Sequence, residues 1–574
     1  MSEGSAPIVG IDLGTTNSAI TVFQDGRARL IENELGEQLT PSAVAYDARA
    51  GGVVVGRIAK DLLARNPALG TLSFKRHMGT EQTLKVNGEA WTPEQLSSYV
   101  LDSLRTDAER FLGRSVERCV VSVPAYFSEA ARFATRRAAE MAGLVVERVV
   151  NEPTAAALAY GMHDAENEKR FLVFDLGGGT FDVCVMEIFE GMLEVKSVAG
   201  VSQLGGDDFT TALMTRALSL AGLVHDDPAV TAESRAALLK RAEIAKRKLS
   251  KWPVVTVEMP EWAGEPARSV ELTQEIARDA YGPLLDRFVR PCREVLRSGG
   301  IGVSDIDEVL LVGGATKMPL VANLAAELFD REPKTLDDPE LAVAKGSAIQ
   351  AALYADDASL QDLVVTDVLS HSLGVGVVRE IGGKLIDGYF SPVIHRNTVI
   401  PTSRTEEFET VMDNQRQLHF EVYEGESRKS RENDLLGTLT IKDLPKSPSG
   451  LQVAVTFTYD ISGILEVTAR LPGTDNVTRE VFVRNRALGE QAIEQAIKRI
   501  QQLKADPRER PKYRDLLGRA ELLWAESPPE LRDRIALVLD QFESSLASAN
   551  PSAMERSYEV LREVCNRYDG GERW

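Results

Sequence analysis

The chain has 574 residues, too many for one hydrophobic core, and this length predicts about four compact units. Its 66 basic and 86 acidic residues give a net charge of −20, which repels phosphodiester backbones and argues against a nucleic-acid partner. The four cysteines are far apart and have no metal-ligand spacing, and the sequence has neither a secretory signal nor an apolar run of membrane-spanning length, so we expect a cytoplasmic protein without a membrane partner.

The first part of the chain, to about residue 357, is predicted to be an α/β region. Short apolar runs at 8–11, 119–123, 171–174 and 309–312 alternate with amphipathic helical patterns such as 94–111. The segment IDLGTT at 11–16 returns as FDLGGGT at 174–180, so that Asp175 follows Asp12 by 163 residues. A repeat at this distance indicates two related halves that face each other, not a solenoid.

The rest of the chain divides into three segments that differ in the spacing of their apolar residues. Residues 358–368 form an apolar stretch between acidic residues, and we interpret them as a linker that can dock. The period is two from 369 to 486, which predicts an antiparallel β sandwich, and 487–574 is predicted to be a helical lid that begins with an apolar stripe from Ile493 to Leu503.

Three glycine turns follow predicted strands and can bind phosphates or a nucleoside. Backbone N–H groups and hydroxyls without bulky side chains are the donors that phosphate oxygens need. One such turn is more often an ordinary tight turn, but three at strand ends indicate a nucleotide site. The turns contain Gly14, Thr15, Thr16 and Asn17, then Gly177, Gly178, Gly179 and Thr180, and last Gly313, Gly314, Ala315 and Lys317.

Two aspartates end their strands at equivalent places in the two halves. Asp12 and Asp175 should therefore converge and hold Mg²⁺ through water. Phosphoryl transfer also needs a cation near the developing charge, and Lys75 is the candidate. Its position alone is more typical of a solvated surface lysine, and the role rests on the resemblance described next.

With VPAYF at 123–127 and NEPTAAA at 151–157, these turns resemble the 70 kDa heat-shock protein (DnaK-type) chaperone family. The resemblance implies a multidomain protein: an actin-like ATPase of two α/β lobes with a duplicated ribonuclease-H-like motif, an antiparallel β sandwich and a short α-helical lid. It implies an ATP-dependent molecular chaperone, and an ATPase, that binds extended apolar segments of unfolded or specific client proteins. ATP and ADP with Mg²⁺ would be its ligands, with K⁺ left open as a further cation.

The resemblance also assigns residues of the nucleotide region. The residues that would carry out ATP hydrolysis are Lys75, Asp12, Glu152, Asp175 and Thr180. Two further glycines, Gly205 and Gly206, would join the turns that bind phosphate. A helix over ribose and adenine would contribute Glu243, Lys246, Arg247 and Ser250, which by themselves suggest a solvated helix face. Pro124, Arg132 and the linker residues Asp362, Leu363, Val364, Val365 and Asp367 would transmit nucleotide state, and Arg148 would contact a J-domain cochaperone.

In the β domain the resemblance predicts a peptide slot. Its residues would be Leu373, Val375, Val377, Val378, Phe408, Val411, Leu418 and Phe420, several of which also suit an ordinary sandwich core.

Departures from the housekeeping members predict a specialised protein. The segment between Lys75 and Pro124 is shorter, which leaves the exchange factor open, and Val378 and Val411 stand where Met and Ala are usual. Thr366 replaces a linker leucine, Glu340 replaces an aspartate, and the helical end is short. Together these features are typical of the short HscC-like bacterial branch.

Three other interpretations of the lobes are a carbohydrate kinase, a nucleotide-controlled filament protein and a non-hydrolysing sensor. We rank them lower because none of them uses both the linker and the β sandwich.

Overall fold

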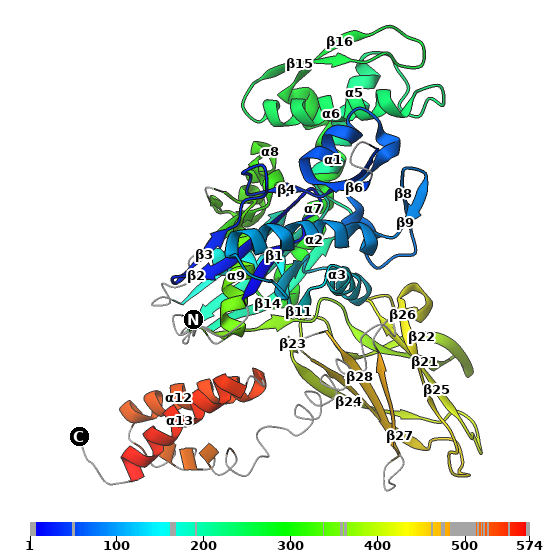
Figure 1. Cartoon of the computed structure of the whole chain (residues 1–574). Helices are drawn as coiled ribbons and strands as arrows, with labels where there is room; N and C mark the ends of the chain where they lie inside the picture. The colour runs from blue at the N-terminus through cyan, green and yellow to red at the C-terminus, as the bar shows by residue number, and fades with distance from the viewer. Residues whose placement is uncertain are drawn as a thin grey trace. The chain divides into compact units, whose positions relative to one another are not determined.

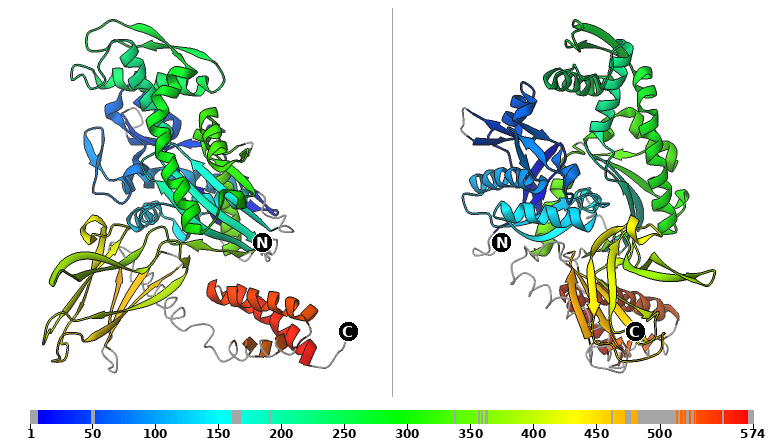
Figure 2. Two further views of the ribbon diagram at one scale, coloured as in Figure 1. Left: turned by 180° about the vertical axis from the view of Figure 1, so that it is seen from behind. Right: turned by 90° about the vertical axis from the view of Figure 1, so that its right-hand side faces the viewer.

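A computed structural model describes residues 7–48, 52–160, 168–189, 192–336, 338–355, 357, 360, 364–460, 463–471 and 477–482, together with parts of 513–569 (Figure 1). Contacts divide the chain into two units, Met1–Ser370 and His371–Trp574, and each is described by itself. The first unit contains two lobes, which stand side by side in the right-hand view of Figure 2, blue to cyan and green.

The two lobes are built on sheets with the same strand order. In the first sheet the order is β11-β10-β1-β2-β3, and in the second it is β18-β17-β12-β13-β14-β19. In both, the central strand pairs antiparallel with the next strand of the chain and parallel with a strand that comes much later. This shared topology explains the sequence repeat, and the predicted duplication is confirmed.

The strands of the first sheet are β1 (Ile8–Asp12), β2 (Asn17–Gln24), β3 (Arg27–Leu30), β10 (Arg118–Val123) and β11 (Val145–Asn151), with β4 (Thr40–Pro41) beside β2. The strands of the second are β12 (Lys169–Leu176), β13 (Phe181–Phe189), β14 (Met192–Val201), β17 (Glu308–Val312), β18 (Lys334–Thr335) and β19 (Val364–Val365), and β20 (Asp367–Val368) follows.

Helices cover these sheets and close their cores. They are α2 (Pro93–Leu112), α3 (Glu129–Met141), α4 (Glu152–Ala159) and α9 (Ala342–Tyr354), and α5 (Gly206–Leu220), α6 (Ala232–Leu249), α7 (Gln274–Gly299) and α8 (Pro319–Phe329). The helix predicted at 94–111 is confirmed as α2: a capping box of Thr92 and Gln95 starts it, and Gly113 at φ 66° ends it. Its buried face joins the core of the first lobe, and the second lobe has a separate core.

Smaller elements lie outside the two main sheets. The strands are β5 (Ala43–Asp47), β6 (Gly52–Val55) and β7 (Gly70–Leu72), β8 (Leu84–Val86) and β9 (Glu89–Trp91), and β15 (Val254–Met259) and β16 (Arg268–Thr273). The short helices are α1 (Gly56–Leu63), η1 (Pro67–Leu69), η2 (Phe74–His77), η3 (Val303–Asp305) and η4 (Gly314–Lys317).

The second unit holds the predicted β sandwich. Two antiparallel four-stranded sheets, β22-β21-β25-β26 and β24-β27-β28-β29, place alternate side chains between them. The strands are β21 (Leu373–Ile381), β22 (Lys384–Ile394), β24 (Thr402–Glu409), β25 (Leu418–Glu424), β26 (Asp434–Ile441), β27 (Gln452–Tyr459), β28 (Leu465–Arg470) and β29 (Val477–Phe482), with β23 (Val399–Ile400) and η6 (Ser430–Glu432) between them.

The described residues of the C-terminal part are mostly helical, in agreement with the prediction. Helices α12 (Pro529–Ser548) and α13 (Pro551–Asp569) share an apolar core with residues such as Tyr513, Phe542 and Leu561. The predicted stripe from Ile493 to Leu503 lies outside the described residues.

Candidate functional site

The two repeated turns lie directly against each other. A Cβ atom at Gly178 would lie 1.8 Å from Oγ1 of Thr16, and one at Gly179 would lie 2.7 Å from Oγ1 of Thr15. Only residues without a side chain allow this approach, because a real Cβ needs more than 3 Å. The sequence repeat therefore forms one site at which both lobes present backbone and hydroxyl groups.

A third segment completes this cradle at the start of α5. The N–H of Gly206 donates to the carbonyl oxygen of Gly177 at 2.9 Å, and the N–H of Asp207 donates to that of Gly178 at 2.9 Å. Gly205 caps the helix, and a Cβ there would lie 2.4 Å from the backbone of Gly178. A helix N-terminus beside two glycine turns is a favourable environment for phosphate oxygens.

The predicted catalytic side chains converge below this cradle. Nζ of Lys75 is 2.5 Å from Oε1 of Glu152, and Lys75 is only 2% exposed. Asp12, at the end of β1, accepts a hydrogen bond from Ser122 at 3.1 Å. The alternative of a solvated surface position for Lys75 is wrong, because the lysine is buried against a carboxylate.

Burial, and then repulsion between neighbouring carboxylates, raises the pKa values of three aspartates in this site. Burial, then the charge of Glu152, raise the pKa of Asp12 to about 7, against the opposing effects of Lys75 and Ser122. The same two causes raise the pKa of Asp182 to about 7. Burial also raises the pKa of Asp175 well above its usual value, reinforced by Glu152, Asp182 and Asp12. A group of acids around one lysine favours the arrival of a further cation.

The residues present fit a hydrated magnesium ion with a nucleotide. Within the described part of the chain, Oδ2 of Asp175 and Oγ1 of Thr16 are buried without a hydrogen-bond partner, and such atoms need one. Among the described residues, no three His, Cys, Asp or Glu side chains converge closely enough to hold a metal by themselves. Coordination through water and phosphate oxygens, as the sequence predicts, agrees with both observations.

Three of the predicted nucleoside residues of α6 form an ion-pair cluster that contacts Gly206 through Lys246. On α6, Nζ of Lys246 donates to the carbonyl oxygen of Gly206 at 2.7 Å and lies 2.6 Å from a carboxylate oxygen of Glu243. Arg247 pairs with the same glutamate at 2.7 Å, and Ser250 caps the helix.

The third glycine turn approaches the same place from β17. A Cβ at Gly206 would lie 3.3 Å from Ala315, and one at Gly313 would lie 2.8 Å from Oδ1 of Asp175. Lys317 points elsewhere, to Glu340 at 2.6 Å, and is half exposed.

Four residues of the site were not among the predicted ones, and they bridge the lobes. Oγ of Ser73 donates to Asp207 at 2.6 Å. The guanidinium of Arg76 donates to the carbonyl oxygen of Gly179 at 3.1 Å and pairs with Asp208. The clue in the sequence was their place beside Lys75 and Gly206, but polar residues next to a motif are usually solvated.

The described linker residues dock on the first unit. Val364 and Val365 form β19, a parallel edge strand on β14, and Thr366 donates its N–H to the carbonyl oxygen of Leu193 at 3.0 Å. Asp367 accepts a hydrogen bond from Nδ2 of Asn151 at 2.6 Å. Asp362 and Leu363 lie outside the described residues.

The predicted relay residues lie around that contact. Arg132 bonds the side chain of Asn151 and donates to the carbonyl oxygen of Ala125 at 3.2 Å, one residue after Pro124. Burial lowers the pKa of the Arg148 guanidinium, and the nearby Asp367 carboxylate opposes that shift. Asn151, a further residue that sequence reasoning did not select, directly precedes Glu152 and thus connects Asp367 to that glutamate.

The predicted peptide residues divide between core and surface. Leu373, Val375 and Phe420 are buried in the sandwich, as the alternative interpretation expects. Val378 and Val411 are exposed, whereas Val377, Phe408 and Leu418 are half-buried. The rings of Phe408 and Phe420 lie 5.6 Å apart.

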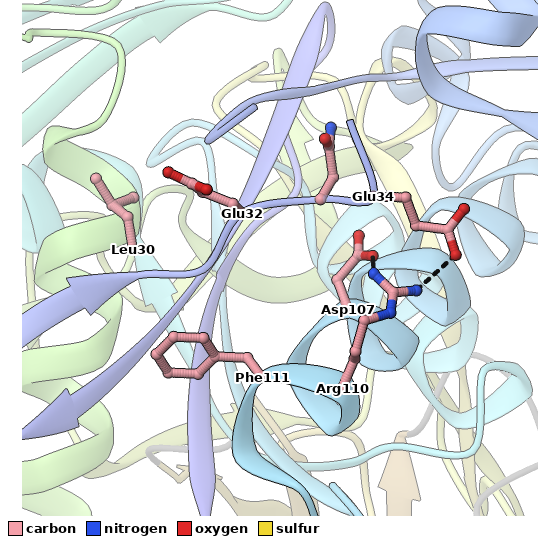
Figure 3. Close-up of a pocket in the computed structure, with 7 residues that line it drawn as sticks. Leu30, Glu32, Glu34, Asp107, Arg110 and Phe111 are labelled. Carbon is pink, nitrogen blue, oxygen red and sulfur yellow. Dashed lines mark hydrogen bonds and ion pairs between the residues drawn. The ribbon is translucent and has the colours of Figure 1, made fainter. Parts of the chain in front are cut away.

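A pocket on the first lobe is separate from this machinery (Figure 3). Arg110 joins two of its acids, Glu34 at 2.6 Å and Asp107 at 3.0 Å. Its lining consists of Leu30, Glu32, Asn33, Glu34, Asp107, Arg110 and Phe111, none of which belongs to the nucleotide cradle.

Two further observations bear on the class of protein. No helix within the described residues is long and apolar enough to cross a membrane. A protein-family model described as Hsp70 protein matches residues 8–85 and 80–567, which is nearly the whole chain. This match confirms the predicted resemblance and fold class, and the narrower bacterial branch stays a prediction.

Proposed function

Because the chain belongs to the Hsp70 family and is a chaperone of that type, we propose that it hydrolyses ATP and uses the cycle to bind and release extended apolar segments of client proteins. The observation that carries the proposal is the apposition of the two repeated turns above buried Lys75 and its carboxylates. Phosphoryl transfer depends on such positioned cations and backbone donors more than on covalent help.

Each group of residues has a proposed role. Thr15, Thr16 and the turn 177–180 would hold the phosphates, and Gly14 and Asn17 would shape the first turn. Asp12 and Asp175 would hold the waters of Mg²⁺, and that ion would neutralise charge on the phosphate oxygens. Lys75, fixed by Glu152, would stabilise charge on the transferred group, and Thr180 would help to position the attacking water.

The nucleoside would lie between α6 and the third glycine turn. Glu243, Lys246, Arg247 and Ser250 would face it from one side and Gly313, Gly314 and Ala315 from the other. Lys317 would have to leave Glu340 to join them. Lys246 already donates to Gly206 beneath this place, so the ligand would bind to a preformed pocket wall.

The linker offers a route for coupling. Asp367 bonds Asn151, and Asn151 directly precedes Glu152, which holds Lys75. Docking of the linker and the position of Lys75 would therefore influence each other, and such coupling is reciprocal and typically worth about 1–3 kcal/mol. Arg132 and Pro124 would carry the same signal, and a J-domain cochaperone would act near Arg148. Clients would bind along the exposed residues of the predicted slot.

The first test is steady-state ATP hydrolysis with and without an extended apolar peptide. Wild-type hydrolysis should rise with peptide, and Lys75→Ala should reduce it by at least about a hundredfold, because the buried cation is lost. Lys85→Ala, an exposed lysine of the same lobe, is the matched control and should behave as wild type. An active Lys75→Ala protein would contradict the proposed role of the lysine.

The second test separates basal ATP hydrolysis from its stimulation by peptide. Val365→Asp puts a charge into β19, so basal hydrolysis should persist while stimulation by peptide disappears. Val254→Asp, at an exposed strand position of the first unit, is the control. Full stimulation of Val365→Asp would refute coupling through the linker.

The same preparations test the other three interpretations. Phosphate transfer to a sugar would favour a carbohydrate kinase, sedimenting ATP-dependent polymers a filament protein, and nucleotide binding without hydrolysis a sensor.

A further inference from the structure

Strands β21 and β25 are neighbours in one sheet of the sandwich (Figure 1), and they stop pairing at the predicted slot. β25 pairs with β21 only at residues 373–375, and the last pair is Val375 with Val422. Beyond it, no other described strand pairs with the facing edges of β21 and β25, so their main-chain N–H and C=O groups are left open. An extended segment gains main-chain hydrogen bonds from such edges.

Two predicted slot residues on these edges point into the sandwich. Side chains alternate along a strand, so Val377, two residues after Val375, and Phe420, two residues before Val422, face the space between the two sheets. Continued beyond the last pair, the antiparallel register places Val377 opposite Phe420. A client side chain that pointed inward between the two strands would therefore meet Phe420.

The floor of the slot is closed by the protein's own side chains. Phe420 is only 5% exposed, and Leu373 and Val375 are 0% exposed. The ring of Phe420 lies 5.6 Å from the ring of Phe408, which reaches it from β24 of the opposite sheet. A pocket that is open to water exposes the residues that line it, so Phe420, Leu373 and Val375 do not line an open pocket.

Other residues of the slot remain accessible as an apolar surface. Phe408, Leu418 and Val377 are half-buried, and Val378 is exposed. A peptide can therefore contact apolar side chains along the slot, but a large side chain that points inward has to displace the packed rings. Overfilling a packed core is unfavourable, whereas a methyl group needs little room.

We propose that the slot selects client segments with a small side chain at the inward-pointing position, alanine rather than leucine or phenylalanine, and that Phe420 and Phe408 set this limit. The inference rests on the proposed peptide-binding function and adds the class of client. The two open edges require an extended chain, and the closed floor between them limits the size of the side chain that enters.

The test compares fluorescent apolar peptides of about six residues, the length of a typical strand, that differ only at one central position. That position is Ala, Val, Leu or Phe, and binding to the whole chain is measured with ADP present. Sliding of such a short peptide is disfavoured, because a shift by two residues removes main-chain hydrogen bonds at one end. We expect the Ala-centred peptide to bind about tenfold more tightly than the Leu-centred one, whereas on an open apolar surface the larger side chain would bind more tightly.

Variants assign the limit to the two rings. Phe420→Val makes room in the floor, so the Leu-centred peptide should then bind at least as tightly as the Ala-centred one. Phe408→Val should shift the order in the same direction, and because Phe408 is only half-buried, this variant serves if Phe420→Val fails to fold. Phe482→Val, which removes a half-buried ring from β29, is the matched control and should keep the wild-type order.

The outcomes separate this inference from the proposed function. If none of the peptides binds the wild-type protein, both fail. If the Leu-centred or Phe-centred peptide binds wild type most tightly, or all four bind alike, the size limit is overturned and the chaperone function stands. If wild type prefers alanine but folded Phe420→Val and Phe408→Val proteins keep that order, the two rings do not set the limit, and the inference is overturned as well.

Discussion

At the scale of single residues, Gly205 offers a sharp test of the cradle. A Cβ there would lie 2.4 Å from backbone atoms of Gly178 and Gly179, which cannot rotate away as a side chain can. Gly205→Ala should therefore separate α5 from the glycine turn and reduce ATP hydrolysis by about tenfold or more, while the fold persists. The measurement is hydrolysis together with far-ultraviolet circular dichroism.

The control for Gly205→Ala is Gly282→Ala. A Cβ at Gly282, which lies in α7, would meet no atom within 4 Å beyond the backbone of its own helix. Alanine should therefore be tolerated there and should favour the helix by up to about 1 kcal/mol. Equal activity of the two variants would show that the close approach at Gly205 has no importance for the site.

The cysteines give a prediction about pH. Burial raises the pKa of the Cys119 thiol to about 12 and raises the pKa values of Cys184 and Cys292 as well, and all four thiols are buried. An exposed thiol would react about twentyfold faster at pH 9 than at pH 7, because its thiolate fraction rises through an ordinary pKa.

In the native protein, thiol reactivity should stay low throughout pH 7 to pH 9, since the thiolate fraction remains minute below the raised pKa values and burial keeps the reagent away. Denaturant should expose all four thiols, as a colorimetric thiol reagent would measure. One fast native thiol whose rate rises with pH would contradict the burial.

The sequence predicted which residues form the site, but it did not predict which of them hydrogen-bond to one another. The repeat located Asp12, Asp175 and both glycine turns, because a duplicated motif at strand ends leaves a direct signal in the sequence. The bonds of Arg76 to Gly179 and of Asn151 to Asp367 join segments 103 and 216 residues apart. No local pattern records which distant partner a polar side chain will meet.

At the scale of elements, the residue that follows linker strand β19 has a hydroxyl group whose hydrogen-bonding capacity is not satisfied. Oγ1 of Thr366 is buried and, among the described residues, has no hydrogen-bond partner. An unsatisfied buried hydroxyl costs about 1–3 kcal/mol, whereas a methyl group of the same size does not. The docked linker is therefore weaker than its shape allows.

Thr366→Val should strengthen docking and slow proteolytic cleavage at residues 364–368 by about fivefold, which corresponds to about 1 kcal/mol. Thr366→Ser retains the hydroxyl and should not slow cleavage. If Thr366→Ser were cleaved more slowly than Thr366→Val, the hydroxyl would be hydrogen-bonded in the docked linker.

Helices and strands were predicted correctly where apolar residues recur in the sequence at a regular period. Helix α2 and strands β25 and β27 lie where amphipathic or alternating patterns predict them. The long hairpin of β21 and β22 was not predicted, since two glycines between short apolar runs are equally compatible with a tight loop. Its length depends on where β25 stops pairing with β21, which is a tertiary property.

At the scale of the first unit, the closed cleft depends on contacts that cross between the lobes. Arg76 of the first lobe holds Gly179 and Asp208 of the second, and Ser73 holds Asp207 beside them. These bonds join the segments beside the glycine turn and are mostly protected from water, so they contribute more than surface ion pairs do. One of them holds Gly179, which would contact the phosphates, so the lobes and the ligand should stabilise each other.

Arg76→Ala should therefore release nucleotide faster, because it removes two donors that close the lobes. We expect dissociation of a fluorescent ADP analogue to accelerate about tenfold, the equivalent of about 1.4 kcal/mol, with a smaller effect on its association rate. Arg105→Ala removes an arginine whose ion pairs, among the described residues, lie within α2, and it should leave release unchanged. If both variants released the ADP analogue at the wild-type rate, the bonds between the lobes would not limit nucleotide release. The linker would then be the next element to test for control of that release.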